Sequence, residues 1–195
     1  MLTASLRRDG TRPLLTWYDD ATGERIELSV ATAANWAVKT ANLLLDEGVE
    51  VVRLVPGEHW LAAVVALGAW TAGTAVGDDG DPLPGDPQQF MTTVLAQPDA
   101  LMGAPPPPDA TALAIGGRSW TLTELAEAAG KAAAQHGVFA GARVLSTWPL
   151  DTVHGIDAGL LIPLAVDGSV VLVANADAVK LDARAATERV THRLG

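Results

Sequence analysis

The alternation of apolar and polar segments over residues 143–174 constrains the fold more than any other feature of this sequence. A short apolar strand leads into a polar turn at 148–155, an apolar helix follows, and a glycine turn precedes a second apolar strand at 169–174. This pattern predicts one βαβ unit. Because ligands bind at the carboxyl ends of the strands in an open parallel sheet, the turn at 148–155 is where we expect a functional site.

The same alternation continues through the chain and predicts an α/β protein with mostly parallel sheets flanked by helices. Besides those of the βαβ unit, the expected strands are 14–18, 25–28, 49–54, 74–76, 91–95 and 111–115. The expected helices are 1–12, 58–72, 181–193, one from the cap Ser29 to Gly48, and one from a Thr121–Glu124 capping box to Gly137. Turns are expected at 19–23, 56–57 and 116–117, and a loop at 78–88.

A proline run at 105–108 is typical of a stiff extended spacer. We therefore expect a first α/β lobe at 1–104, a linker at 105–110 and a second α/β lobe at 111–195.

The two lobes resemble each other. Residues 26–29 match 120–123, and residues 73–76 match 168–171. Gly48 and Gly137 end the corresponding helices. Two interpretations stay open: a true duplication, or the general likeness of any two α/β segments.

Composition excludes several classes of function. The chain has no cysteine, which rules out disulfides, thiolate nucleophiles and cysteine-bound metals. A net charge of -10 argues against nucleic acid or an anionic membrane surface as a partner, since both attract clustered Lys and Arg. The uncharged run at 60–77 is diluted by glycine and threonine and lacks basic anchors, so a buried helix and strand are favoured over a membrane span. We expect a cytoplasmic location.

Three candidate chemical sites have weak patterns. Ser146, Asp151 and His154 could form a nucleophilic triad, but Ser146 falls in an apolar strand without a Gly-x-Ser-x-Gly elbow. His154 and Asp157 share a helical face, yet no second histidine stands at the spacing of a metal ligand. The segment 116–119 offers small residues, an arginine and a hydroxyl before a helix, without the glycine fingerprint of a phosphate loop.

Residues 143–173 resemble a segment of the acyl-adenylate-forming, AMP-binding enzymes, the acyl-CoA synthetase superfamily. That segment reads strand, Leu-Pro-Leu, aromatic-His, apolar helix and Gly-Ser-Val-Val-Leu. Residues 10–77 resemble the amino-terminal opening of the same superfamily, and the helix after 121–123 looks like the one that follows its phosphate loop. The likeness is strongest to short proteins that carry only the early part of the large domain, and it implies two related lobes as in the N-terminal domain of AMP-binding enzymes.

The sequence departs from this resemblance where adenylation depends on particular residues. The place of the phosphate loop, which should end in Pro-Lys-Gly, holds residues 111–118 with no lysine. The donors that neutralise ATP phosphates are therefore missing or altered. The histidine position of the motif is Thr152, and His154 follows two residues later. The later adenine and ribose sites and the domain with the catalytic lysine have no room in 195 residues.

We therefore expect a truncated, non-catalytic binding or interaction module without a cofactor or metal. Its site for a small acyl or nucleotide ligand would combine Trp148, Asp151, Thr152, His154 and Gly155 with Gly116, Gly117 and Arg118. The alternative is an enzyme that forms an acyl-adenylate from Mg-ATP and a carboxylate and is completed by a partner chain. An uncovered sheet edge predicts a homo-oligomer or a protein partner.

Overall fold

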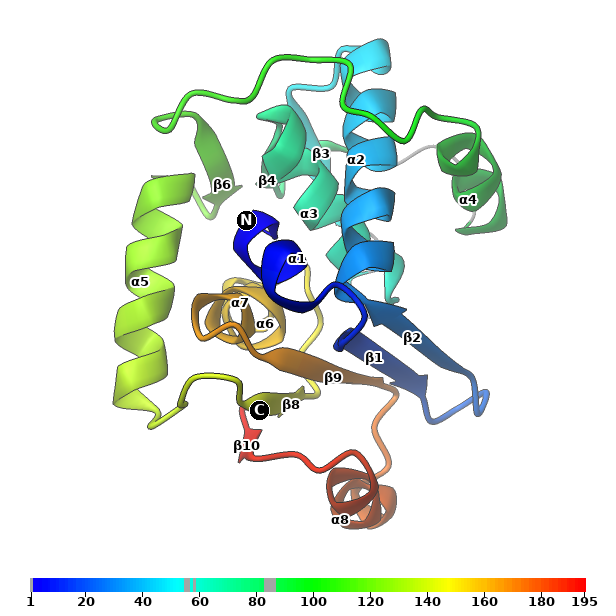
Figure 1. The fold of residues 1–195 in the computed structure, drawn as a ribbon, viewed down its shortest axis with the longest axis vertical. Helices are drawn as coiled ribbons and strands as arrows, with labels where there is room; N and C mark the ends of the chain where they lie inside the picture. Colours follow the sequence, from blue (N-terminus) through cyan, green and yellow to red (C-terminus); the bar gives the residue numbers. More distant parts are fainter. Residues whose placement is uncertain (1, 55–56, 58, 83–86) are drawn as a thin grey trace.

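The computed structural model describes residues 2–54, 57, 59–82 and 87–195 and contains two five-stranded sheets flanked by helices (Figure 1). The helices are α1 Thr3–Asp9, α2 Val30–Glu47, α3 Leu61–Ala72, α4 Pro87–Leu95, α5 Leu122–Gln135, α6 Val153–Ile156, the π-helical η1 Asp157–Leu161, α7 Ile162–Ala165 and α8 Ala178–Thr187. The strands are β1 Pro13–Asp19, β2 Arg25–Ser29, β3 Val51–Arg53, β4 Ala75–Gly77, β5 Asp81–Pro82, β6 Thr111–Ile115, β7 Arg118–Thr121, β8 Arg143–Ser146, β9 Ser169–Ala174 and β10 His192–Arg193. The predicted α/β class is confirmed.

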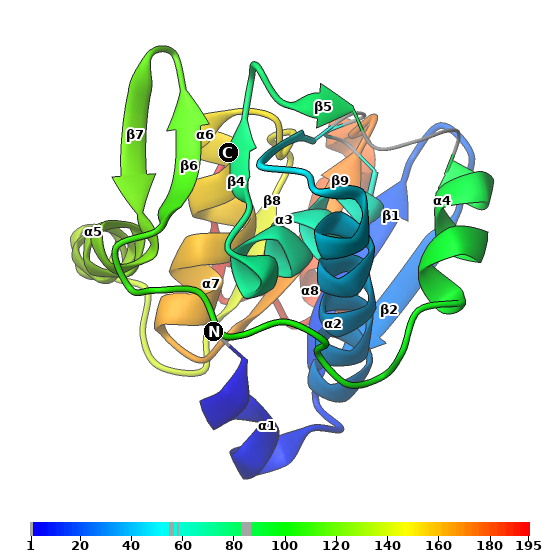
Figure 2. The same ribbon diagram turned by 90° about the horizontal axis from the view of Figure 1, so that it is seen from above.

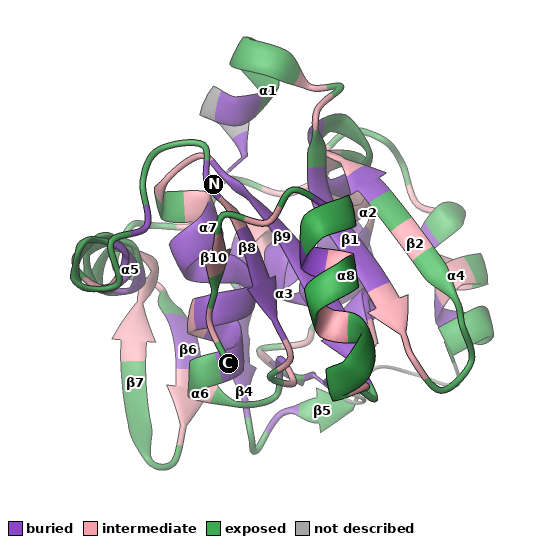
Figure 3. Cartoon of the chain, turned by 90° about the horizontal axis from the view of Figure 1, so that it is seen from below, coloured by how far each residue is buried: buried purple, intermediate pink, exposed green. Residues whose placement is uncertain are grey.

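Both sheets are mostly parallel. Sheet A has the strand order β10-β8-β9-β1-β2, and sheet B has the order β5-β3-β4-β6-β7. Within the described residues, the antiparallel pairs are the edge hairpins β1–β2 and β6–β7. The βαβ unit predicted at 143–174 is confirmed: β8 and β9 pair in parallel, and α6, η1 and α7 connect them. Strand β9 is buried along its whole length, whereas α8 exposes most of its surface (Figure 3).

The two sheets repeat one plan, with the hairpins exchanged between the halves of the chain (Figure 2). Each hairpin is followed by a long helix, and that helix leads to a strand of the other sheet. The β1–β2 hairpin lies in sheet A and leads through α2 to β3 of sheet B. The β6–β7 hairpin lies in sheet B and leads through α5 to β8 of sheet A. This interlocked topology supports the interpretation that the lobes are a duplication.

The strand registers correct the sequence match at 73–76. Leu15 and Leu113 hold the same position in their hairpins, where they pair with Leu28 and Trp120. In the parallel ladders Leu15 pairs with Val170 and Leu113 pairs with Val76, so Val76 is equivalent to Val170. Residues 73–76 therefore correspond to 167–170, one residue earlier than predicted. The prediction was wrong because it aligned two glycines, whereas the structure has a left-handed residue before each strand, Gly73 with φ 84° and Asp167 with φ 52°.

Each sheet contains strands from both sides of the expected linker at 105–110. Sheet A combines β1 and β2 with strands from the end of the chain, and sheet B continues from β4 across the proline segment to β6. The segment before the prolines is held by one side of α2, where Asn42 Nδ2 donates to the carbonyl oxygens of Pro98 and Ala100 at 3.1 and 2.9 Å. The segment that leads into the proline run is thus attached to helix α2.

Several predicted bounds change. Residues 91–95 belong to helix α4, not to a strand, because Phe90 and Val94 bury one helical face four residues apart. The last helix ends at Thr187 instead of 193, where Arg189 takes a φ of 52° and the chain turns into β10. The predicted loop at 78–88 contains β5 and the start of α4, and its residues 83–86 lie outside the described part, as do Pro56 and Glu58.

The two predicted helix caps, Ser29 and Thr121, are confirmed. Ser29 Oγ accepts a hydrogen bond from Thr32 N at 3.1 Å, and Thr121 Oγ1 accepts one from Glu124 N at 3.2 Å. Glu124 Oε2 in turn accepts from Thr121 N at 2.8 Å, which completes the capping box. These caps fix where each hairpin ends and its helix begins.

Candidate functional site

A cavity of about 180 Å³ opens at the carboxyl edge of sheet B. The ends of β3, β4 and β6 contribute six of its residues, and the turn after β8 contributes the seventh. They are Arg53, Leu54, Val76, Gly77, Asp78, Ile115 and Asp151. In open parallel sheets, ligands bind beyond the carboxyl ends of the strands, and this cavity lies at such a place. Its lining combines residues of sheet B with one residue that follows a strand of sheet A.

Asp151 reaches this cavity because the turn after β8 is fastened to the loop after β3. Leu150 is buried and donates its backbone N–H to the carbonyl oxygen of Gly57 at 2.8 Å. Gly57 in turn lies so close to Asp151 that a Cβ atom on Gly57 would be 2.5 Å from Asp151 Cγ. Only a glycine leaves room for this approach.

Thr152 and Gly155 shape the turn itself. Thr152 Oγ1 accepts a hydrogen bond from Gly155 N and donates one to the carbonyl oxygen of Pro149, both at 3.0 Å. A Cβ atom at Gly155 would lie 1.9 Å from that carbonyl oxygen. Both residues were candidates for ligand contact, and the structure gives them a capping and packing role at the start of α6.

Trp148 and His154 lie together but not among the residues that line the cavity. Their ring centroids are 4.8 Å apart in an edge-to-face arrangement. Trp148 is 40% exposed, and Gly195 packs against its indole ring. Ser146 is buried, and its hydroxyl accepts a hydrogen bond from Trp148 N at 3.3 Å. The three residues of the weak triad hypothesis thus have separate surroundings.

Gly116 and Gly117 form a tight two-residue turn between the paired residues Ile115 and Arg118. Both glycines have positive φ, 61° and 71°, which is the signature of a type I′ hairpin turn. Gly116 N donates to Asp78 Oδ2 at 2.9 Å, so this glycine touches the cavity through Asp78. The Arg118 guanidinium lies 5.0 Å from the centre of the Trp120 ring, on the hairpin rather than over the cavity.

The charged groups of the cavity are Arg53, Asp78 and Asp151. Among the residues that the structure describes, none of the three forms an ion pair, so their charges are free to meet a ligand. Sequence reasoning missed Arg53 and Asp78. Asp78 stands two residues after the predicted strand 74–76. The expectation that ligands bind at the carboxyl ends of parallel strands, which pointed to the turn at 148–155, would therefore also have pointed to Asp78.

The His154–Asp157 pair does not complete a metal site. Burial in η1 raises the pKa of the Asp157 carboxyl, and the charge of His154 opposes that shift. No group of three or more metal-ligating side chains occurs in the part of the chain that the structure describes.

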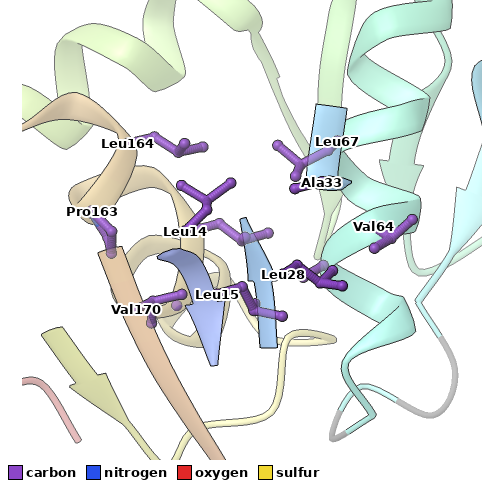
Figure 4. Close-up of a pocket in the computed structure, with 12 residues that line it drawn as sticks. Leu14, Leu15, Leu28, Ala33, Val64, Leu67, Pro163, Leu164 and Val170 are labelled. Atoms are coloured by element: carbon purple, nitrogen blue, oxygen red, sulfur yellow. The ribbon is translucent and has the colours of Figure 1, made fainter. Parts of the chain in front are cut away.

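A second hollow lies inside the apolar core and is too small for a ligand. Figure 4 shows leucines of β1, β2, α3 and α7 around it, with Pro163 and Val170 completing one wall. Its volume of about 10 Å³ is close to that of one water molecule's probe sphere, and its lining is apolar. It is a packing gap between the interlocked halves.

A protein of Mycobacterium tuberculosis (strain ATCC 25618 / H37Rv), described as a TIGR03089 family protein, is 36% identical to this chain over 239 residues. The match covers 100% of this chain and 96% of that relative. This chain belongs to the TIGR03089 family. No family model matches the sequence.

The fold of this family member is that of the N-terminal domain of AMP-binding enzymes, as the resemblance implied. The anthranilate CoA ligase AuaEII superposes with a TM-score of 0.79 at 15% identity, over 98% of this chain and 47% of the ligase. An acyl-CoA synthetase of Brucella canis gives 0.77 at 13%, over 97% and 45%. The N-terminal domain of FACL13 from Mycobacterium tuberculosis gives 0.77 at 13%, over 98% and 61%.

The family member thus spans about half the length of the solved synthetases. Within its described residues, no helix combines the length and apolarity needed to cross a bilayer.

Proposed function

We propose that this protein is a non-catalytic binding module that holds a small polar ligand at the carboxyl edge of sheet B. The observation that carries the proposal is the position of Asp151, which comes from the βαβ unit of sheet A and lines a cavity otherwise built from sheet B. Carboxylates at Asp78 and Asp151 accept hydrogen bonds from hydroxyl or amino groups, and Arg53 can bind an anionic group.

Adenylation by this chain alone is disfavoured by the same geometry. Binding of ATP phosphates needs a ring of backbone donors and a cation, whereas the β6–β7 turn has two residues and no lysine lines the cavity. Lys39 of α2 is bound to Asp99 at 3.0 Å, Lys131 lies on α5, and Lys180 lies on α8. Formation of an acyl-adenylate with a partner chain is the second candidate, and the fold of the solved ligases favours it.

Isothermal titration with adenosine, AMP, Mg-ATP and a non-hydrolysable acyl-adenylate analogue tests the proposal. We expect micromolar binding of a ribose-bearing probe, weakened about tenfold or more in Asp151→Asn, because hydrogen bonds to a charged group contribute roughly 1.5–3 kcal/mol. Asp109→Asn removes the same charge from an exposed site in the linker and should bind like the wild type.

Absence of heat with every probe would contradict the binding module. Tight binding of Mg-ATP, with exchange of pyrophosphate into ATP when a carboxylate is added, would favour the second candidate instead.

The predicted homo-oligomer and cytoplasmic location are part of the same proposal. A monomer at micromolar concentration in sedimentation velocity would contradict the homo-oligomer. Fractionation of the native cells tests the cytoplasmic location.

A further inference from the structure

Asp78 connects the β6–β7 turn to the cavity. It follows β4 directly, and its backbone N donates to the carbonyl oxygen of Ala114 at 3.3 Å. Its Oδ2 accepts the hydrogen bond from Gly116 N at 2.9 Å, while the same side chain lines the cavity. A carboxylate of the protein therefore already occupies a backbone donor of the glycine turn.

This arrangement opposes a phosphate group. Backbone N–H groups of glycine turns attract anions, but a phosphate that approaches Gly116 would have to displace Asp78 from it. It would also meet the second carboxylate, Asp151, and only one cation, Arg53. Arg118, the other nearby cation, is held over the Trp120 ring.

We infer that Asp78 is the specificity-determining residue of this cavity: it excludes phosphate groups and selects ligands that offer hydroxyl or amino donors. The inference rests on the proposed function, since it concerns the ligand choice of the same cavity. Carbonyl oxygens and carboxylates accept hydrogen bonds from hydroxyl and amino groups. They cannot donate a hydrogen bond to the oxygens of a phosphate. The ligand class is therefore a small neutral or cationic polar molecule rather than a nucleotide.

The test compares AMP and inorganic phosphate with adenosine in three proteins: wild type, Asp78→Asn and Asp79→Asn. Asn at position 78 keeps an acceptor for Gly116 N and removes the charge. Asp79 is the next residue, is exposed, and does not line the cavity, so Asp79→Asn is the matched control for net charge. We expect Asp78→Asn to bind AMP about tenfold more tightly than the other two, because one like charge near the phosphate is gone.

Adenosine should bind the wild type and Asp79→Asn equally and Asp78→Asn more weakly, because an amide is a weaker acceptor than a carboxylate for the hydroxyl groups of the ligand. Equal gains in AMP affinity for Asp78→Asn and Asp79→Asn, or no gain in either, would overturn the inference. Asp78→Ser is a second variant in case the first unfolds, which circular dichroism monitors. Failure of the proposed function has a different signature, since the wild type would then bind neither adenosine nor the acyl-adenylate analogue, while the ratio of AMP affinities between the variants still decides the role of Asp78.

Discussion

The carboxyl edges of the two sheets hold equivalent places in the repeated plan and differ in what fills them. Leu15 pairs with Val170 in sheet A as Leu113 pairs with Val76 in sheet B, so Trp17 of β1 is the counterpart of Ile115 of β6. Ile115 borders the open cavity with Asp151. Trp17 is buried, and a histidine ring from the opposite loop lies against it with centroids 5.2 Å apart.

That histidine is His59, and it corresponds to Asp151. Each follows the first strand of a βαβ unit and reaches across to the other sheet, Asp151 from β8 and His59 from β3. At one edge an isoleucine and a carboxylate leave a polar cavity, and at the other a tryptophan and an imidazole close the space. The difference teaches that the shared frame fixes two places for a site, and that side-chain volume decides which of them stays open.

Replacing the tryptophan should give the largest effect. Trp17 is 2% exposed, so Trp17→Ala should lower the free energy of unfolding by about 3–5 kcal/mol, the usual cost of removing a buried indole and leaving a cavity. Urea denaturation followed by far-UV circular dichroism measures it. The paired variant Ile115→Ala, at the open edge, should cost about 1–2 kcal/mol because that side chain is only partly buried. Equal losses at the two positions would contradict the contrast between the edges.

Most of the order of strands and helices was predictable from the sequence, because hydrophobic periodicity and glycine or threonine signals mark the longer elements locally. Helix α4, expected as a strand, and the two-residue strands β5 and β10 were not predicted. The exchange of hairpins was not predictable, because no local signal says that β1 pairs with β9, residues far away in the chain. The same limit applies to the candidate site. Asp151 and Asp78 were each predictable as residues that follow a strand, whereas their meeting with Arg53 around one cavity depends on tertiary packing between the two sheets.

Two other predicted site residues have local structural roles instead of lining the cavity. Thr152 and Gly116 were singled out as residue types that also serve caps and tight turns, and the structure uses them so. A single sequence gives the same pattern for a cap as for a ligand-binding turn. The positive φ of Gly116 and the 3.0 Å bond of Thr152 to Gly155 N distinguish the two only once the backbone path is known.

The helix caps test whether the halves are equally stable. Ser29→Ala and Thr121→Ala should each lower the free energy of unfolding by about 1 kcal/mol, because each removes the side chain that satisfies a free N–H at a helix start. The two losses should match within about 0.5 kcal/mol if both helices join the same cooperative unit. Ser119→Ala, an exposed strand residue, is the control. A loss confined to one helix, seen by hydrogen exchange, would show that the halves unfold separately.

The smallest effect should come from the protonation of His59. Burial lowers the pKa of this imidazole, and the charges of Glu24 and Asp19 only partly oppose the shift. The neutral ring is also required by its hydrogen bond, since Nδ1 accepts from Leu61 N at 3.2 Å. Below the ordinary histidine pKa of about 6.5, the unfolded state therefore binds more protons than the folded state, and stability falls with pH until the folded pKa is passed.

We expect the free energy of unfolding of the wild type to decrease between pH 7.5 and pH 5.5 by more than that of His59→Gln, measured in urea at both pH values. Carboxylates with lowered pKa values, such as Asp20 and Glu188, titrate below this window. His136→Gln changes an exposed histidine and should keep the wild-type dependence. A pH dependence that survives in His59→Gln would mean that the aromatic edge tolerates a charged ring, and the two edges would then differ in shape but not in polarity.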